Sequence, residues 1–411
     1  MTRAATRALG VVYAVAWAIA GWLWNGPPSD LDNFFLPAVR VVLSGHPLLV
    51  YTVRYQGIIA NDNGPLGLVP LTAVSAVVSQ LGWLNDERLR RMLIMGAFSI
   101  FSLLMAWEAV AAIDRLRGAT LAGWARLLAY GVFAASPTLV NAVLGYGHIE
   151  QPMTLWLVLL AVRLLARGRS ASAGIGFGLA ILTRSLAALP VIPLSLLLLA
   201  RGRWRALIAL GGSAAVTIAL GLLPFALADR SDTIYSLVTH RAQLPVGGGS
   251  FWQLVVGTPY QWLPQRWDVL FVLGLVVLLS LLVIAGRQDL EPSSRDTYGL
   301  LALTALALPL LAKSVWPYYF FDAYVFGTVW WLGQAEPLAL RQRLVAVAIP
   351  LIAVLGTLLT EYEMPASAAH VRLLEGVTMG ALLSALLVAL AIRLQRPPIR
   401  VSLHVAGRAG R

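Results

Sequence analysis

Long apolar segments alternate with short polar connections along nearly the whole chain. The apolar blocks occupy residues 8–24, 65–83, 92–113, 120–140, 152–167, 171–200, 206–228, 267–286, 296–312, 317–333, 344–360 and 371–392. Most of these blocks match the roughly 20 residues that a helix needs to cross a bilayer core of about 30 Å. The pattern therefore predicts an all-α polytopic membrane protein that forms a single integral membrane domain over residues 1–411.

Two of the blocks allow more than one interpretation. Block 65–83 either crosses the membrane or lies at its surface, and block 171–200 is either one long span or two short ones, broken near Thr183, Arg184 and Ser185. Cytoplasmic loops are enriched in Lys and Arg. A surface helix at 65–83 with a double crossing at 171–200 puts 20 of the 31 basic residues inside, against 17 for the reverse assignment. We therefore predict about twelve transmembrane helices, with both termini in the cytoplasm and non-crossing extracytoplasmic helices near 32–44 and 66–82.

Composition narrows the class of protein further. Hydrophobic residues make up 59% of the chain and charged residues 12%, about half the charged fraction of soluble proteins. The absence of cysteine excludes disulfides and thiol catalysis. The net charge of +12 comes from short arginine clusters between apolar blocks, so we interpret it as membrane anchoring and expect no nucleic-acid partner.

The first candidate residues for chemistry are Asp30 and Asp32, which directly follow the first predicted span. A carboxylate there is able to act as a general base toward a sugar hydroxyl. An Asp before a helix is also an ordinary N-cap. Both interpretations stay open, and one residue could cap while the other accepts a proton.

Further candidates fall on the same predicted outer side of the membrane. His148 and Glu150, in the stretch G-Y-G-H-I-E-Q-P, are candidates for substrate binding. The competing interpretation is that they lie at a solvated helix start. Arg184 lies at the tip of the predicted double crossing, and arginine binds phosphate oxygens with two hydrogen bonds.

The second predicted outer loop and the segment after residue 312 add five more candidates. His240 and Arg241 offer a proton carrier and a cation in a loop that is otherwise a plain linker. Lys313 and Tyr318 lie near the outer surface, where an aromatic belt is the competing interpretation. Asp322 falls inside the following span, and an acid there is a functional candidate. No metal-ligand spacing, phosphate loop or nucleotide fingerprint occurs, so we expect neither a metal nor a cofactor.

The order of these features resembles the GT-C superfamily of membrane glycosyltransferases, and most closely the bacterial polyprenol-phosphate-mannose-dependent mannosyltransferases of glycosyltransferase family 87. Asp30-Leu31 with its following aromatics resembles the first-loop pattern of the family, and N-G-P-L-G-L-V-P-L at 63–71 resembles its juxtamembrane Pro-Pro-Leu helix. The stretches at 145–151 and 173–184 are similar to its Gly-Gln motif and its small-residue helix ending in Thr-Lys. The chain departs from these patterns at Gly64, His148 and Arg184.

The resemblance implies an inverting transferase that moves a sugar, a hexose or pentose such as mannose, from a polyprenyl-phosphate donor to a lipid or glycan acceptor. It implies a multi-pass protein of the cell membrane with an extracytoplasmic active site, in which Asp30 or Asp32 is the base. Arg184, and with it Arg241, would hold the donor phosphate. The expected organisation is a catalytic module over 8–230, an outer loop over 231–266, C-terminal helices over 267–392 and a basic cytoplasmic tail over 393–411.

Two other classes of function remain as alternatives. A transporter or flippase of lipid-linked sugars would carry an internal repeat or matched broken helices in its two halves. We find no convincing repeat, and the outward-facing acids favour an enzyme. A non-catalytic membrane scaffold would tolerate substitution of Asp30 and Asp32.

Overall fold

The computed structural model describes residues 3–26, 29–52, 54–55, 58–59, 61, 63–83, 85–247, 250–334, 340–361, 380–381 and 383–384. Nearly all of the predicted span 371–392 and the whole predicted tail 393–411 lie outside these residues. The described part is helical apart from one short antiparallel pair, in which Arg54 is opposite Ile59 and Tyr55 opposite Ile58. The predicted all-α class is confirmed for the described residues.

The helices follow the apolar blocks with shifted ends and several breaks. They are α1 Arg3–Leu23, α2 Leu36–Leu43, α3 Leu68–Gln80, α4 Glu87–Arg117, α5 Gly123–Ala134, α6 Pro137–Val140, α7 Glu150–Ala166, α8 Ser170–Thr183, α9 Val191–Ala200, α10 Trp204–Ala228, α11 Arg230–Ile234, α12 His240–Gln243, α13 Trp262–Gly286, α14 Arg295–Ala305, α15 Ala307–Leu311, α16 Phe321–Leu332 and α17 Leu340–Glu361. The strands are β1 Arg54–Tyr55 and β2 Ile58–Ile59. Short π turns cover Leu31–Phe35, Asn141–Gly145 and Tyr235–Thr239, and 3₁₀ turns cover Pro47–Leu49, Pro65–Gly67, Ser185–Ala188, Phe251–Val255 and Pro317–Phe320.

Four described helical segments are long and apolar enough to cross a membrane: Glu87–Arg117, Gly123–Gly145, Trp204–Ala228 and Trp262–Gly286. The predicted number of about twelve crossings stays a prediction. Helix α10 leaves most of its apolar surface uncovered, with Leu220 69% and Leu227 77% exposed. Apolar faces of this extent are unusual on soluble monomers, and they suit contact with lipid.

Helices α1 and α4 run antiparallel, packed through small residues. A Cβ on Gly21 would lie 2.9 Å from the carbonyl oxygen of Arg91, and one on Gly96 would lie 3.2 Å from Cβ of Ala18. The segment between the two helices, which contains α2 and α3, therefore begins and ends at the same end of the pair. This is the arrangement that a non-crossing helix at 65–83 requires.

The chain between α8 and α9 is broken at the predicted place. Helix α8 ends at Thr183, Arg184 is extended, and a 3₁₀ turn follows at Ser185–Ala188. The far ends of both helices lie near the connection between α13 and α14, because Arg201 donates to the carbonyls of Arg287 and Leu290, while the residues just before α8 lie beside Pro292. The segment thus leaves and returns to one end of the molecule, although its placement in a membrane stays a prediction.

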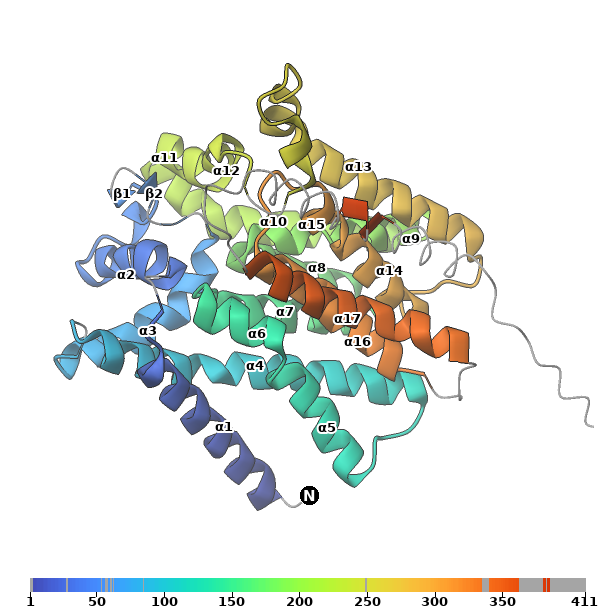
Figure 1. Ribbon diagram of the computed structural model, residues 1–411, viewed down its shortest axis with the longest axis horizontal. Coiled ribbons are helices and arrows are strands. Elements are labelled where there is room, and N and C mark those ends of the chain that lie inside the picture. Colours follow the sequence, from blue (N-terminus) through green and yellow to red (C-terminus); the bar gives the residue numbers. More distant parts are fainter. Residues whose placement is uncertain are drawn as a thin grey trace, which may run out of the picture.

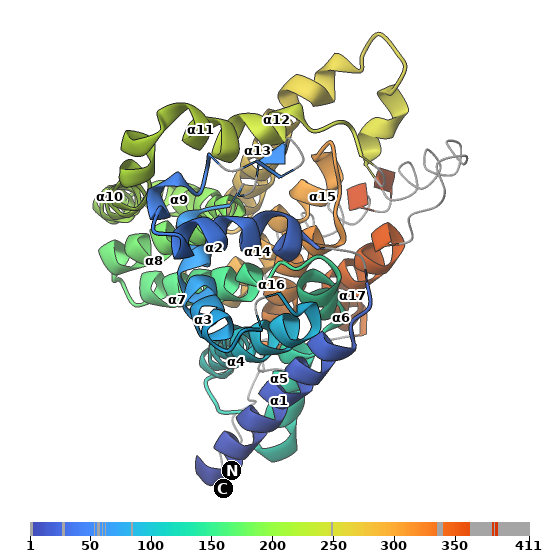
Figure 2. The same cartoon turned by 90° about the vertical axis from the view of Figure 1, so that its left-hand side faces the viewer.

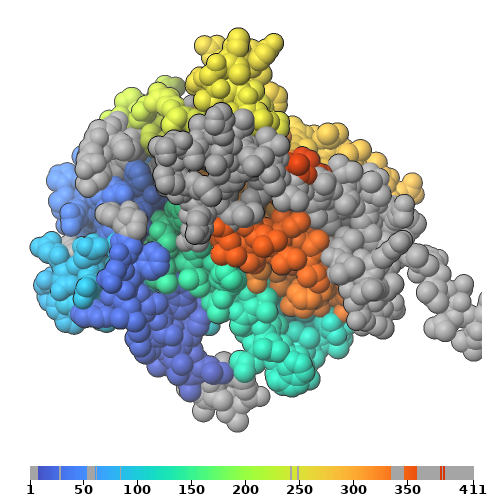
Figure 3. Space-filling view, viewed as in Figure 1, coloured from blue at the N-terminus to red at the C-terminus, as the bar shows by residue number. Residues whose placement is uncertain are grey.

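The long helices lie side by side across the molecule, and the short elements gather at one end of them. In Figure 1 α4, α7, α8 and α17 run across the view, with α2, α3 and the two strands at their left-hand end. Figure 2 looks onto that end, where α2, α11 and α12 lie in front of the long helices. The segment preceding α13 projects from the body as a separate lobe (Figure 3).

Candidate functional site

Two loops from distant parts of the sequence meet at the end of the long helices where the short elements gather. The backbone N–H of Asp30 donates to the carbonyl of Tyr146 over 3.0 Å. The contact is close because Gly147 has φ +74° and lacks a Cβ, which would lie 2.7 Å from the backbone nitrogen of Leu31. A π turn adjoins each loop, one directly after Asp30 and one at Asn141–Gly145, and π turns inside helices are frequent at functional sites.

At this junction a histidine lies between two carboxylates. His148 Nε2 is 3.0 Å from Asp30 Oδ2, and His148 Nδ1 is 2.7 Å from Glu150 Oε1. Burial alone would lower the pKa of His148, but the charge of Glu150 and the close contact with Asp30 raise it to about 9. Both ring nitrogens can donate to these oxygens only when the ring is protonated. At neutral pH the group is therefore an imidazolium that bridges two acids.

The two carboxylates differ sharply in their access to solvent. The side chain of Glu150 is 1% exposed, whereas that of Asp30 is 34% exposed. The side chain of Asp30 makes no N-cap hydrogen bond to the turn that it precedes. Asp30 is therefore held in place by His148 and is open to an incoming molecule.

Asp32 lies in a different environment, although it is only two residues away. Its Oδ1 accepts from Arg90 over 2.9 Å and its Oδ2 from Arg91 over 2.7 Å, and the backbone N–H of Ser29 also donates to it. Burial opposes the shift, but these hydrogen bonds and the charge of Arg91 lower the pKa of Asp32. The carboxylate joins the first loop to the start of α4.

Arg184 approaches the same cluster from the break between α8 and the following turn. Its guanidinium lies 5.0 Å from the centre of the Tyr318 ring, and that ring lies 4.0 Å from the ring of His148. Arg184 is 5% exposed, and its Nη1 makes no hydrogen bond within the described part of the chain. A buried guanidinium with an unused donor is suited to bind an anion.

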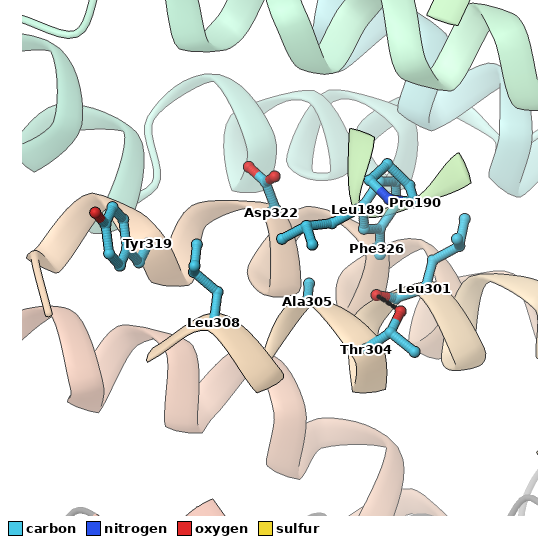
Figure 4. A pocket seen from close by; sticks show the side chains of 9 residues that line it. All are labelled: Leu189, Pro190, Leu301, Thr304, Ala305, Leu308, Tyr319, Asp322 and Phe326. Carbon is cyan, nitrogen blue, oxygen red and sulfur yellow. Dashed lines mark hydrogen bonds between the residues drawn. The ribbon is translucent and has the colours of Figure 1, made fainter. Parts of the chain in front are cut away.

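Asp322 completes the cluster from α16. Gln151 Nε2 donates to its Oδ1 over 3.3 Å and to the carbonyl of Tyr318 over 2.9 Å, and Arg184 is close enough to interact with its charge. Asp322 also lines a cavity of about 10 Å³, about the size needed for one water. Figure 4 shows Asp322 beside mostly apolar side chains, including Leu189, with its carboxylate pointing away from them.

The structure thus brings together six of the ten predicted site residues, which we call the Asp30 cluster: Asp30, His148, Glu150, Arg184, Tyr318 and Asp322. Asp32 lies beside it but is engaged with the two arginines. Lys313 is 2% exposed, and its backbone bonds to Asp268 and Gly247. His240 lies in α12 with its ring 6.3 Å from that of Tyr235, and the side chain of Arg241 lies outside the described part. The roles of these last three stay predictions.

Three side chains that belong to the site were not among the ten predicted site residues. Gln151 connects α7 to Asp322, and Tyr146 and Trp316 form an aromatic group with Tyr318, at ring separations of 5.9 Å and 5.4 Å from Tyr146. Gln151 and Tyr146 lie within the same G-Y-G-H-I-E-Q motif that indicated His148. Trp316 lies in the segment for which an interfacial aromatic belt was the competing interpretation, and its position alone gave no sign of its partners.

The glycines of the first loop let it pack directly on the end of α8. A Cβ on Gly64 would lie 2.0 Å from the carbonyl oxygen of Leu182, and one on Gly67 would lie 3.3 Å from Cβ of Glu150. The departure from the family pattern at Gly64 therefore has a physical reason, since a larger residue would push the loop away from Arg184 and Glu150.

The arrangement combines an accessible carboxylate, a bridging imidazolium and a buried guanidinium with a free donor. Among the described residues no group of three or more His, Asp or Glu side chains has the geometry of a metal site. The chemistry available from these side chains is proton acceptance at Asp30 and anion stabilisation at Arg184.

The comparison with known families identifies one match. A model of glycosyltransferase family 87 matches residues 69–309, which is more than half of the chain. The matched region contains His148, Glu150 and Arg184 and leaves Asp30 and Asp322 outside it. No curated protein matches the chain.

Proposed function

We propose, since the chain belongs to glycosyltransferase family 87, that it transfers a sugar from a polyprenyl-phosphate donor to a lipid or glycan acceptor, with inversion at the anomeric carbon. We also propose that the chain crosses the cell membrane about twelve times and that the Asp30 cluster lies at its extracytoplasmic face. The observation that carries it is the pairing of an exposed carboxylate, Asp30, with a buried guanidinium, Arg184, around one histidine.

In the proposed reaction Asp30 takes the proton of the acceptor hydroxyl as its oxygen forms a bond to the anomeric carbon. The bond from that carbon to the phosphate oxygen breaks, and its electron pair stays on the polyprenyl phosphate. Attack on the face opposite the leaving group inverts the carbon. The transition state resembles the oxocarbenium ions of glycoside hydrolysis.

Arg184 is proposed to bind the phosphate and to stabilise the charge that develops on the leaving oxygen. A guanidinium in a water-poor site acts strongly on such a charge. Its cation–π contact with the Tyr318 ring holds the guanidinium without using its N–H donors. Helices that expose apolar faces, such as α10, supply a surface for the lipid tail.

His148 and Glu150 are positioning residues in this proposal. The ion pair with the imidazolium fixes the direction of the Asp30 carboxylate, and the charge of buried Glu150 keeps the imidazolium protonated. Asp32 is assigned a structural role, because a carboxylate with a lowered pKa that accepts from two arginines is a poor base.

The test compares donor classes on the purified full-length protein. Synthetic polyprenyl-phosphate sugars and the matching nucleotide sugars are offered with membrane glycolipid acceptors, and products are identified by mass spectrometry. We expect transfer from the lipid-linked donors only, with the linkage inverted. Equal transfer from nucleotide sugars, or retention of configuration, would contradict the proposal. Comparing the envelope glycolipids of a deletion strain with those of its parent identifies the acceptor.

A further inference from the structure

Three arginines surround a cavity at the opposite end of α4 and α7 from the Asp30 cluster. The cavity measures about 190 Å³ and is lined by Arg115, Arg163 and Arg167, with Ser293 and Tyr298 on the facing wall. Since a water occupies roughly 30 Å³ of liquid, the space is large enough for a phosphate group and its oxygens.

The charge around this cavity is unbalanced. Glu108 is the carboxylate beside it, fully buried, with its Oε1 3.1 Å from Arg163 Nε and 3.7 Å from Arg115 Nη2. Arg167 adds a third positive charge close enough to act on Glu108. Three guanidiniums against one carboxylate leave an excess of two positive charges.

Part of the hydrogen-bonding capacity at the cavity is also unused. Arg163 Nε is buried, and although it lies at ion-pair distance from Glu108, it makes no hydrogen bond in the described part of the chain. Neither oxygen of Glu108 accepts a hydrogen bond there. The carboxylate therefore offsets charge without occupying the guanidinium donors.

Arginines at the end of a span are usually interfacial anchors whose heads extend into water. Arg163 differs from such an anchor, because its side chain is 19% exposed and faces Glu108 and the cavity. Arg167 and Arg169 are both exposed, but only Arg167 lines the cavity. A cavity that combines excess positive charge with an unused guanidinium donor has the chemistry that phosphate recognition requires.

We infer that this cavity is a second anion site, which binds a phosphate group at the end of the molecule remote from the Asp30 cluster. Helix α7 has 17 residues between the two sites and spans about 25 Å at 1.5 Å per residue. This is close to the roughly 30 Å of a bilayer core, so the second site lies at the depth of the opposite leaflet. The phosphate comes either from an anionic phospholipid headgroup or from free phosphate in solution.

The test measures lipid and phosphate binding to the purified full-length protein. Native mass spectrometry is used to count phosphatidylglycerol and phosphatidylcholine retained after purification from a mixture of the two. A parallel titration with inorganic phosphate follows the melting temperature in a zwitterionic detergent. The variants are Arg115→Gln with Arg167→Gln, which leave the Arg163–Glu108 pair intact, and Arg169→Gln as the matched control.

Selective retention of phosphatidylglycerol that falls about tenfold in the double variant, but not in the control, identifies a headgroup site. Stabilisation by inorganic phosphate without selective lipid retention, lost in the same variant, identifies a site for free phosphate. If neither ligand distinguishes the wild-type protein from the double variant, the inference is wrong. Should the double variant fail to fold, Arg167→Gln alone is measured against Arg169→Gln, and equal binding by these two overturns the inference.

Discussion

Replacing Asp30 and Asp32 by asparagine, one at a time, should separate catalysis from stability. The two substitutions are chemically identical and two positions apart, and asparagine preserves shape. Asp30 contacts one imidazolium and is 34% exposed, whereas Asp32 accepts from two arginines and is 12% exposed. The structure therefore predicts opposite consequences for the two variants.

Asp30→Asn should lower the transfer rate and leave the protein stable. The amide oxygen of asparagine can still accept from His148, so the 3.0 Å contact survives with an uncharged acceptor. What disappears is proton acceptance, which is worth roughly 10²–10⁴-fold in rate. We expect a melting temperature near that of the wild type and a rate at least about a hundredfold lower.

Asp32→Asn should lower stability more than it lowers the rate per folded molecule. Arg90 and Arg91 are 8% and 4% exposed, and removing one partner of a buried pair costs about 3–5 kcal/mol. Glu87 remains 3.0 Å from Arg91, so we expect the lower end, about 3 kcal/mol.

The assay combines thermal unfolding of the purified variants, followed by tryptophan fluorescence, with the initial rate of sugar transfer normalised to folded protein. A stable, fully active Asp30→Asn protein would refute the assignment of the base. An inactive but stable Asp32→Asn protein would reverse the two roles.

Three further predictions concern the donor clamp, the histidine and the topology. Arg184→Ala should reduce turnover of the lipid-phosphate donor far more than it reduces protein yield, and Arg184→Lys should restore part of the activity, since charge returns without the two-pronged donor; an unchanged rate in the alanine variant would leave Arg184 as an anchor. Because the pKa of His148 is raised from 6.5 to about 9, its stabilising effect should be complete below pH 6.5 and lost as the pH rises through about 9. The melting temperature of the wild type should fall over that window more steeply than that of His148→Gln, and parallel curves would show that the ring does not titrate there. Single cysteines replacing the exposed residues Ser44 and Asn85, in a chain that has no native cysteine, should both react with an impermeant reagent from outside the cell. A protected Asn85 position beside a reactive Ser44 position would mean that α3 crosses the membrane.

The hydrophobic pattern was sufficient to predict the long helices, although several of them are broken and the short helices α11 and α12 were not predicted. Apolar blocks of membrane length have few alternatives to helix, because backbone groups in lipid must bond within their own segment. The break at Thr183–Arg184 and the short helices near 32–44 and 66–82 were also readable, since charged residues, prolines and glycines interrupt the apolar pattern there.

The sequence motifs also indicated which segments carry chemistry. His148, Glu150 and Arg184 were identified from polar residues in otherwise apolar surroundings, and the structure brings them together with Tyr318 and Asp322. Polar side chains inside a membrane domain are costly unless they have partners. The sequence could not say which partners these were, because up to 292 positions separate Asp30 from Asp322.

The different surroundings of Asp30 and Asp32 depended on tertiary structure. Successive residues of a helical turn are rotated by about 100°, so residues two apart point to nearly opposite sides. Because the first loop packs on α4 and on the turn at Gly147, Asp30 faces His148. For the same reason Asp32 faces Arg90 and Arg91. Sequence indicated that a carboxylate would follow the first helix, whereas the rotation imposed by packing decided which of the two is accessible.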